Sequence, residues 1–424
     1  MQYNLTTLKN KLRVLTVPLP SLESACVSVW VKAGSRNEAE KISGLSHFLE
    51  HMAFKGGKKY RTSQETSYIL DALGAEYNAG TSSEWTNFFI KARSEKLDNA
   101  FEILADMILN ARLDEKEIEK EKGVIIEEIA MHEDTPMWNI NDIFNELIFP
   151  DSPLGRDIAG IPDTVRSFKR NDFIKYRRLH YHPGNMLITV SGGVAEKESI
   201  NLSEKYFGDL KNGRKPDFER FIPKQGKPAL KLKSKKTEQA HFILGFLGNP
   251  RDYKKRYAEG LLSAILGKGM SSRLFEEIRQ KRGLAYSIHT SVSRYIDTGT
   301  FETYEGVKVN KIKDAIKATL DQFYGLKDKK FAITKEELAK VKEYVKGRTA
   351  LALEDTVSVN DFFGERALFL DKIRTPEEEF ENIDKVTIDD IYEVAKDLFV
   401  PDKLNLAIIG PYKDEEQFVK ILSK

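Results

Sequence analysis

The chain has 424 residues, of which 41% are hydrophobic and 31% are charged, and its formal net charge is +2. This length predicts two large domains or three modest ones. A net charge near zero argues against nucleic acid as the dominant partner, and no apolar run approaches membrane-spanning length. With Cys26 as its single cysteine, the chain can form neither an intrachain disulfide nor a thiolate zinc site.

The N-terminal residues do not resemble a targeting segment. They lack the charged-then-apolar pattern of a secretory signal and the arginine-rich pattern of a mitochondrial presequence. We therefore expect a cytoplasmic protein whose partners include neither a membrane nor nucleic acid.

The predicted elements, taken in chain order, describe two similar halves. The first half has predicted strands over residues 12–17 and 25–31, a helix over 43–54, a strand over 186–190 and a helix over 196–206. The second half repeats that order with strands over 229–232 and 241–246, a helix over 257–266, a strand over 404–409 and a helix over 415–422. Residues 211–228 between them are rich in Lys, Gly and Pro and are predicted to be a linker.

The first predicted helix contains the most informative segment, His47-Phe48-Leu49-Glu50-His51. Residues four apart lie about 40° from each other around a helix, so His47 and His51 can reach one ion. Catalytic zinc sites use three protein ligands and leave one position for water, which Glu50 could hold. The order H-x-x-E-H is the inverse of the H-E-x-x-H sequence of zinc proteases. Two unrelated polar residues are the alternative, but the chain has only 7 histidines.

A third ligand has to come from another part of the chain. The remaining histidines offer little, because isolated histidines are more often structural than ligating. The acidic stretch 114–134 is a better source, since its isoleucines have helical spacing. Glu121 and Glu128 share one face of that helix, and Glu127 is the neighbouring candidate. Periodicity alone does not choose between Glu127 and Glu128, and a solvated charged helix remains the alternative.

With these residues the chain resembles the pitrilysin family of zinc peptidases, which includes insulin-degrading enzyme and mitochondrial processing peptidase. In that family the glutamate ligand follows the second histidine after 76 intervening residues, and Glu128 stands at that position. The resemblance covers essentially the whole chain and is to the bacterial and mitochondrial processing-peptidase branch. It rests also on four further segments: Ala33-Gly34-Ser35-Arg36, Asn78-Ala79-Gly80-Thr81-Ser82, Pro153-Leu154-Gly155-Arg156 and Tyr181-His182-Pro183-Gly184-Asn185-Met186. Gly80 departs from the pattern, because many relatives have a larger residue there, and this difference is expected to alter a local substrate pocket.

The resemblance implies one zinc ion per chain, with His47, His51 and Glu128 as ligands and Glu121 supporting the site. Glu50 would be the general base of a zinc endopeptidase, taking a proton from a water whose pKa zinc lowers to roughly 7. The implied fold is α+β, with two structurally similar domains that each pack helices on an antiparallel-rich sheet. Residues 1–210 would be the zinc-binding catalytic domain, and residues 229–424 a metal-free copy that lacks H-x-x-E-H.

A second signature lies in the C-terminal half. Family members use an arginine and a tyrosine seven residues apart to hold the substrate near the scissile bond, and Arg279 and Tyr286 match that spacing. Donors aimed at a peptide carbonyl would stabilise a tetrahedral oxyanion. The alternative is an arginine at a helix end and a tyrosine at the start of a strand.

The substrate and partner follow from the same resemblance. Residues 76–82 resemble the family's edge strand beside the zinc helix, and an extended peptide can add to such an edge. Asn78 and Ala79 are the expected main-chain contacts, and the expected substrates are short or unfolded polypeptides. Larger family members enclose substrates with four such domains, so we expect this two-domain chain to form a homodimer. A non-catalytic scaffold or partner subunit of the same family is the alternative function.

Overall fold

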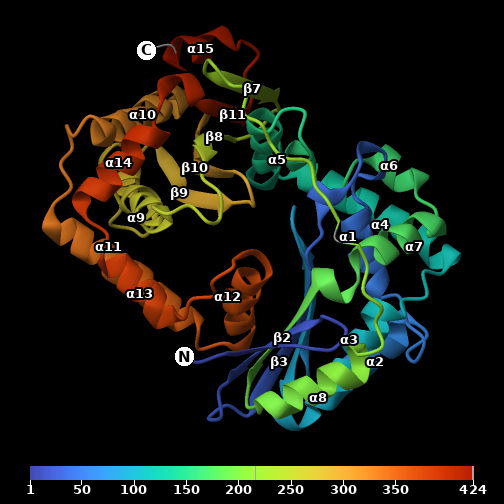
Figure 1. Ribbon diagram of the computed structural model, residues 1–424. Helices are drawn as coiled ribbons and strands as arrows, with labels where there is room; N and C mark the ends of the chain where they lie inside the picture. The colour runs from blue at the N-terminus through green and yellow to red at the C-terminus, as the bar shows by residue number, and fades with distance from the viewer. Residues whose placement is uncertain (215, 423–424) are drawn as a thin grey trace. The chain divides into compact units, whose positions relative to one another are not determined.

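The computed structural model describes residues 1–214 and 216–422, and its contacts divide the chain into two compact units (Figure 1). The first unit comprises Met1–Ala130, Arg156–Glu219 and Ala350–Glu377, and the second comprises Met131–Gly155, Arg220–Thr349 and Glu378–Lys424. Each unit is built around one sheet of the described residues. The second unit therefore includes a segment from the N-terminal half, and the first includes one from the C-terminal half.

The sheet of the first unit has six strands among the described residues, in the order β1-β2-β6-β3-β5-β4. The strands are β1 (Asn4–Thr7), β2 (Arg13–Pro18), β3 (Ser24–Val31), β4 (Glu76–Thr81), β5 (Thr86–Arg93) and β6 (Met186–Gly192). Only the β2–β6 pair is parallel, and every other neighbouring pair in this sheet is antiparallel. β4 therefore lies at one edge, with a single strand neighbour.

The sheet of the second unit repeats this topology with five strands in the described part of the chain, in the order β7-β11-β8-β10-β9. The strands are β7 (Ala229–Ser234), β8 (Gln239–Gly248), β9 (Ala285–Arg294), β10 (Gly299–Lys308) and β11 (Asn405–Gly410). Here β7 and β11 are parallel and the other pairs are antiparallel. The two sheets match strand for strand, except that no described strand takes the place of β1.

The helices follow the strands in the same order in both halves. Between β3 and β6 they are α1 (Leu45–Ala53), α2 (Ser63–Ala72), α3 (Leu97–Leu109), α4 (Glu115–Asp134), α5 (Pro136–Ile148), α6 (Pro162–Ser167) and α7 (Arg170–His180), and α8 (Glu196–Phe207) follows β6. The C-terminal half has α9 (Arg256–Gly267), the π-helical turn η6 (Phe275–Lys281), α10 (Ile312–Lys327), α11 (Lys335–Ala352), α12 (Thr356–Phe369), α13 (Pro376–Asp384), α14 (Ile388–Leu398) and α15 (Glu416–Leu422). None of the helices in the described ranges is both long enough and apolar enough to cross a membrane.

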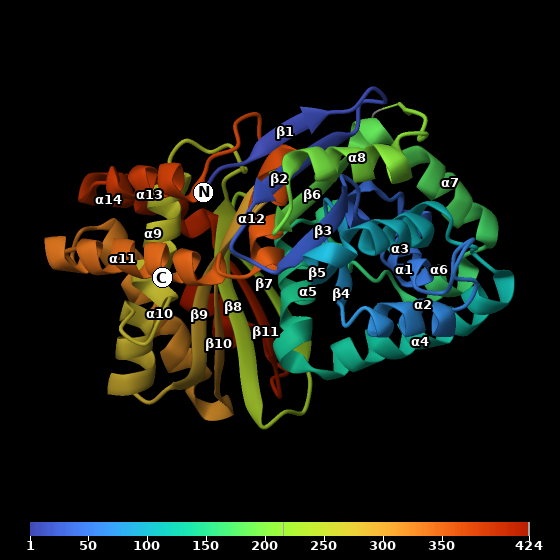
Figure 2. The same cartoon turned by 90° about the horizontal axis from the view of Figure 1, so that it is seen from below.

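Both sheets need cover on two faces, because their central strands are buried throughout. All residues of β6 and of β11 are buried, so side chains pointing to either face lie in a core. In the first unit, one face of the sheet packs against α1 and α3 in a core that includes Val27, Phe48 and Phe101. In the second unit, one face packs against α9, α10 and α14. Figure 2 shows α3 and α8 on one side of the first sheet and α12 on the other.

The second face of each sheet is covered by a helix from the opposite half of the sequence. Phe363 and Val359 of α12 pack with Trp30 and Leu187 of the first sheet. In the equivalent place, Phe144 of α5 packs with strand side chains of the second sheet, such as those of Ile243 and Ala407. Since α5 and α12 occupy the same place in the order of elements, the two halves exchange equivalent helices.

The α+β fold with two similar domains is confirmed, and the predicted strands and helices agree with the observed ones to within about two residues at each end. The compact units differ from the expected ranges 1–210 and 229–424 in the exchanged segments. Helical periodicity indicates that α5 and α12 have apolar faces, but it does not indicate which sheet each face covers. In the expected linker 211–228, the described residues contain no helix or strand.

The exchange predicts how fragments behave. A fragment of residues 1–219 lacks α12 and leaves Trp30, Leu15 and Leu187 without cover on one face of the sheet. We expect it to bind an apolar dye strongly and to unfold at low denaturant concentration. The same fragment joined through a flexible Gly/Ser linker to residues 350–377 should bind less dye and unfold later, which equilibrium urea titrations measure. Equal behaviour of both fragments would contradict the assignment of α12 to the first sheet.

Candidate active site

The start of α1 is fixed by a buried carboxylate. Glu38 accepts hydrogen bonds from the backbone N–H groups of Gly44 (2.7 Å) and Ser46 (2.6 Å) and from the Ser46 hydroxyl, and so satisfies donors that a helix N-terminus leaves free. Burial raises the pKa of Glu38 to about 7, although these hydrogen bonds oppose the shift. Gly44 has φ +96° and a Cβ there would lie 2.3 Å from the Ala159 carbonyl oxygen, so this turn requires glycine.

The apolar face of α1 orients the rest of the helix. Phe48, Leu49 and Met52 are buried, and the Phe48 ring packs edge-on against Phe173 with centroids 4.9 Å apart. This packing places His47 and His51 on the face that meets α4. The rings of the two histidines lie 4.6 Å apart.

Glu128 of α4 completes a set of three donors with the two histidines. Its Oε1 lies 3.8 Å from Nε2 of His47, and its Oε2 lies 3.6 Å from Nε2 of His51. Each of the three residues offers a ligand atom, and these atoms all lie within 4.8 Å of one another. The neighbouring Glu127 is exposed. The geometry therefore brings Glu128 to the histidines, as the resemblance implies.

Glu121, two turns before Glu128 on α4, holds His51 in place. Its Oε1 lies 2.9 Å from Nδ1 of His51, and its Oε2 pairs with Nζ of Lys55 at 2.6 Å. Burial opposes the charged form of His51, but the Glu121 hydrogen bond and the nearby carboxylates outweigh it and raise the pKa of His51. Burial likewise opposes ionisation of Glu121, yet its two cationic partners lower the pKa of this carboxyl. A hydrogen bond at Nδ1 leaves Nε2 of His51 to face Glu128.

His47 is held in its neutral form by its surroundings. Burial, together with the adjacent His51, lowers the pKa of His47 to about 4. Its buried Nδ1 has no hydrogen-bond partner among the described residues. A neutral imidazole is the form that binds a metal ion.

Glu50 lies between the two histidines in sequence and is 9% exposed. One carboxylate oxygen accepts a hydrogen bond from the hydroxyl of Thr81, at the end of β4. Burial raises the pKa of Glu50, and the Thr81 bond and His51 oppose this shift. The carboxyl group is thus fixed in orientation, with the other oxygen available to a small molecule.

The donor set fits zinc. Ligand atoms about 2.0–2.2 Å from a tetrahedral zinc ion lie about 3.4 Å apart, close to the 3.6 and 3.8 Å separations between Glu128 and the histidine nitrogens. Two imidazoles and one carboxylate are a common catalytic zinc set that leaves a position for water. Helix α9, the counterpart of α1, contains no histidine, and its buried Glu259 pairs with Arg294 instead.

The segment before α1 has a structural role. Arg36 and Glu84 form a buried ion pair of 2.7 Å that ties the segment before α1 to the loop between β4 and β5. Gly34 allows this close approach, since a Cβ there would lie 2.0 Å from the Ser82 carbonyl oxygen. The pair therefore helps to set the position of β4 beside α1.

Asn78 and Ala79 lie on β4, which is an edge strand of the first sheet. The N–H of Ala79 donates to the side-chain oxygen of Asn78 at 2.9 Å. The side-chain oxygen of Asn78 thus accepts the hydrogen bond that a backbone carbonyl of a neighbouring strand could accept. Their substrate contacts stay a prediction.

Arg279 and Tyr286 lie together in the second unit, on η6 and at the start of β9. The guanidinium of Arg279 lies 5.3 Å from the ring centroid of Tyr286 and 4.7 Å from that of Phe275. Tyr286 is 73% exposed, which is unusual for a tyrosine in a strand. The structure thus brings the pair together at the surface of its own unit, and its role in catalysis stays a prediction.

Sequence reasoning missed three residues that shape the site. Thr81 holds Glu50, Lys55 pairs with Glu121, and Glu38 caps α1. Lys55 follows His51 by four residues, so helical spacing could have identified it. Glu38 could have been inferred from Gly44, because a glycine N-cap has no side chain and needs an acceptor from elsewhere. Thr81 lies in the segment 78–82 that supports the resemblance, but nothing in the sequence indicated its contact with Glu50.

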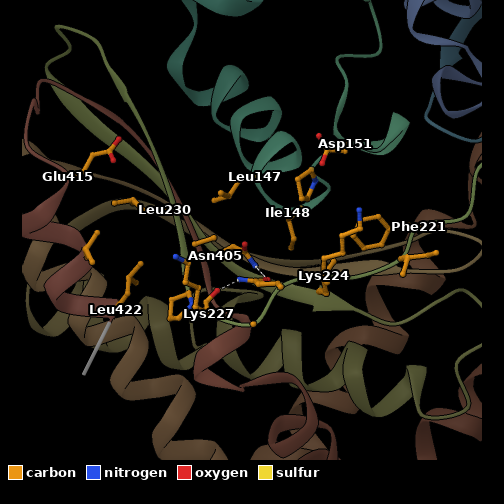
Figure 3. Close-up of a pocket in the computed structure, with 18 residues that line it drawn as sticks. Leu147, Ile148, Asp151, Phe221, Lys224, Lys227, Leu230, Asn405, Glu415 and Leu422 are labelled. Atoms are coloured by element: carbon orange, nitrogen blue, oxygen red, sulfur yellow. Dashed lines mark hydrogen bonds between the residues drawn. The ribbon is translucent and has the colours of Figure 1, made fainter.

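A pocket with a volume of about 720 Å³ occurs in the second unit and contains none of these residues (Figure 3). It is bordered by the end of α5, residues 221–230 and α15. Gln225 bridges there to Asn405 at 3.1 Å, and Leu147, Ile148 and Leu230 supply apolar walls. It offers no cluster of His, Asp and Glu comparable to the one on α1 and α4.

Comparison with known proteins agrees with this geometry. The family model described as insulinase (peptidase family M16) matches residues 13–160, which include all the residues on α1 and α4. A second model, described as the peptidase M16 inactive domain, matches residues 167–345. The second match covers much of the half that lacks the H-x-x-E-H sequence.

Relatives of similar length occur in several bacteria. A protein of Streptomyces coelicolor is 34% identical over 97% of this chain and 90% of its own length, and one of Bacillus subtilis is 34% identical over 96% and 97%. Both are called uncharacterized zinc proteases.

Solved structures show the same fold. A protease from Helicobacter pylori superposes with a TM-score of 0.90 at 27% identity, covering 97% of this chain and 99% of that one. A chain of complex III2 from Candida albicans superposes with a TM-score of 0.84 at 19% identity, covering 99% of both chains, and shares the fold alone.

The contact between Glu121 and His51 predicts a measurable effect on metal binding. Glu121→Gln removes the negative partner of His51 Nδ1, and we expect zinc affinity to fall about 10- to 100-fold, the usual effect of losing such a partner. Competition with a chelating dye measures the affinity. Glu127→Gln, an exposed carboxylate on the same helix, is the matched control and should bind zinc normally. Loss of zinc in Glu127→Gln but not in Glu128→Gln would contradict the choice of Glu128.

Proposed function

Because the chain belongs to peptidase family M16, the insulinase family, we propose that it is a zinc-dependent endopeptidase that cleaves short or unfolded polypeptides. The observation that carries the proposal is the set formed by His47, His51 and Glu128, with the oriented carboxylate of Glu50 beside it. The name zinc protease given to relatives that match nearly the whole chain supports it.

The protein residues divide the work between holding the ion and moving a proton. His47, His51 and Glu128 would hold one zinc ion, which would supply Lewis-acid polarisation and make the attacking water more acidic. Glu50 takes the proton from the attacking water and delivers it to the nitrogen of the leaving amine. Glu121 keeps His51 in the tautomer and orientation that binding needs. Thr81 limits the rotation of Glu50.

The substrate is held by backbone and by two exposed side chains. An extended peptide adds to the open edge of β4, where Asn78 and Ala79 supply main-chain hydrogen bonds. Such contacts depend little on substrate side chains, which supports activity on many flexible sequences. Arg279 and Tyr286 orient the peptide and stabilise charge that develops on its carbonyl oxygen. Their mutual stacking and exposure support that role.

Separating zinc binding from catalysis tests the mechanism. Glu50→Gln should keep its zinc and lose at least about a hundredfold in kcat, because it removes the general base. Arg279→Ala and Tyr286→Phe should also keep zinc and lower kcat/KM, because they act on substrate. Metal analysis and a quenched unstructured peptide measure both properties.

His47→Ala provides the contrast, since it should lose metal and activity together. Wild-type cleavage rates in Glu50→Gln would show that the assigned mechanism is wrong. A wild-type protein that binds zinc but cleaves no peptide would favour the non-catalytic scaffold.

We also propose that the chain acts as a homodimer, in which two copies together provide four domains around the substrate. An enclosure of this kind admits flexible chains and excludes folded ones. The prediction is a dimeric mass in light scattering, and rapid cleavage of an unfolded protein whose folded form survives. A strict monomer, or equal cleavage of both forms, would refute the enclosure and leave the zinc chemistry untouched.

A further inference from the structure

The edge of the second sheet that β7 forms has no partner strand in the described part of the chain. In the first sheet the corresponding strand, β2, pairs with β1 through residues 13–16. Aligning Gly192 at the end of β6 with Gly410 at the end of β11 places residues 229–232 of β7 where residues 13–16 lie in β2. The same four positions are therefore covered by a strand in one sheet and open in the other.

The backbone groups along this edge are placed to pair with a further strand. Ala229 and Lys235 donate their N–H groups toward the β11 side, at 2.9 and 3.0 Å. Successive residues of a strand direct these groups to alternate sides, so those of Leu230, Leu232 and Ser234 point to the open edge. An edge of this kind is a template for pairing with another chain.

The pocket of about 720 Å³ described above lies beside this edge, and we call it the β7 groove (Figure 3). Its lining includes Leu230 of β7, and Ile148 of α5 and Leu422 of α15 belong to the cores on the two faces of the sheet. Water reaches apolar side chains of the groove, since Ile222 is 71% exposed and Val419 is 47% exposed. Free backbone groups beside an apolar groove are what sheets use to bind extended peptides.

The edge carries an excess of positive charge. Two carboxylates pair with its lysines, since Glu146 contacts Lys231 and Asp134 contacts Lys235 at 2.9 Å. Two more, Asp151 and Glu415, line the groove. Against these four carboxylates, residues 224–236 contain no acidic residue and six lysines, which are Lys224, Lys227, Lys231, Lys233, Lys235 and Lys236.

The two faces of β7 differ in chemistry. Lys231 and Lys233 face α5, where Lys233 donates to the side-chain oxygen of Asn139 at 2.8 Å. Leu230 and Leu232 alternate with them and pack against the core that contains α15. A partner strand that alternates acidic and apolar side chains would match both faces.

The lysines disfavour a second copy of the chain as the occupant of this edge. Antiparallel pairing of β7 with β7 would place the lysines of one copy opposite those of the other, and like charges across a strand pair are destabilising. Lysines on an edge strand are a means of preventing such self-pairing. The same lysines attract an acidic strand.

We propose that the β7 edge binds an extended acidic segment of a partner protein as an added antiparallel strand. Its backbone pairs with Leu230 and Leu232, its apolar side chains lie in the groove, and its carboxylates meet the lysines. This binding function belongs to the second unit and uses none of the zinc-binding residues.

A short labelled peptide that alternates valine and glutamate is the probe. Fluorescence anisotropy measures its binding to the Glu50→Gln protein, which is used so that the peptide stays intact. The matched peptide replaces each glutamate with glutamine. We expect the acidic peptide to bind at least about tenfold more tightly at low salt, and the difference to decrease at high salt, because salt screens exposed charges.

N-methylation of the peptide separates strand addition from simple charge attraction. Methyl groups on the alternate amides that face β7 should weaken binding at least about tenfold, because they remove main-chain hydrogen bonds. Methylation of the other alternate set should have little effect. Both methylated peptides keep every carboxylate, so charge attraction alone would affect them equally.

Variants of the protein locate the site. The triple variant Lys224→Gln/Lys227→Gln/Lys236→Gln removes exposed lysines that have no acidic partner among the described residues, and it should weaken binding about tenfold. Ser234→Pro removes an outward N–H at an exposed position of the edge strand, where proline is tolerated, and should also weaken binding. Lys313→Gln, at an exposed position on α10, is the matched control and should bind normally.

The outcomes decide between the occupants. Equal weakening by the two methylated peptides, or normal binding in both the triple variant and Ser234→Pro, would overturn the proposal. A concentration-dependent dimer that Ser234→Pro abolishes would identify a second copy as the occupant and would also overturn it.

Discussion

The central strands of both sheets are buried on both faces, and this single constraint organises the molecule. β6 and β11 have no exposed residue, so neither sheet can face water on either side. Burying both faces contributes roughly 25 cal/mol per Å² of apolar surface, which makes a covering helix on each side a requirement for stability. The chain meets it with α3 and α10 on one face and with the exchanged helices α12 and α5 on the other.

The metal-binding residues depend on that scaffold through α1. Its packed face fixes the rotation of the helix, and Glu38 fixes its start, so His47 and His51 lie next to Glu128. Buried charged side chains of the first unit hold the elements around the site in position. Glu38 is buried at the helix end, and the Arg36–Glu84 pair ties the segment before α1 to the end of β4. A site held this rigidly needs little rearrangement when it binds a metal ion.

Much of this arrangement could be predicted from the sequence. The alternation and apolar runs identify the strands, and the spacing of His47 and His51 identifies a metal-binding helix. The choice of Glu128 over Glu127 required the family resemblance, since both stand in the same helical stretch. The exchange of α5 and α12 could not be predicted, because an apolar face is compatible with either sheet. For the same reason, the contact of Asp361 with Asn87, residues 274 apart in the chain, has no local signature.

The reciprocal exchange has a consequence for half-length chains of this design. Each half of the sequence contains a sheet that must be covered on two faces. The helix that could cover its second face, α5 or α12, instead covers the sheet of the other half. Such a half could bury its second face by pairing with another copy of itself, each lending its helix to the other, as in domain swapping. Joining two such halves end to end would turn a concentration-dependent association into an intramolecular one. One copy would then be free to lose its histidines, while its helix continued to complete the sheet that retains them.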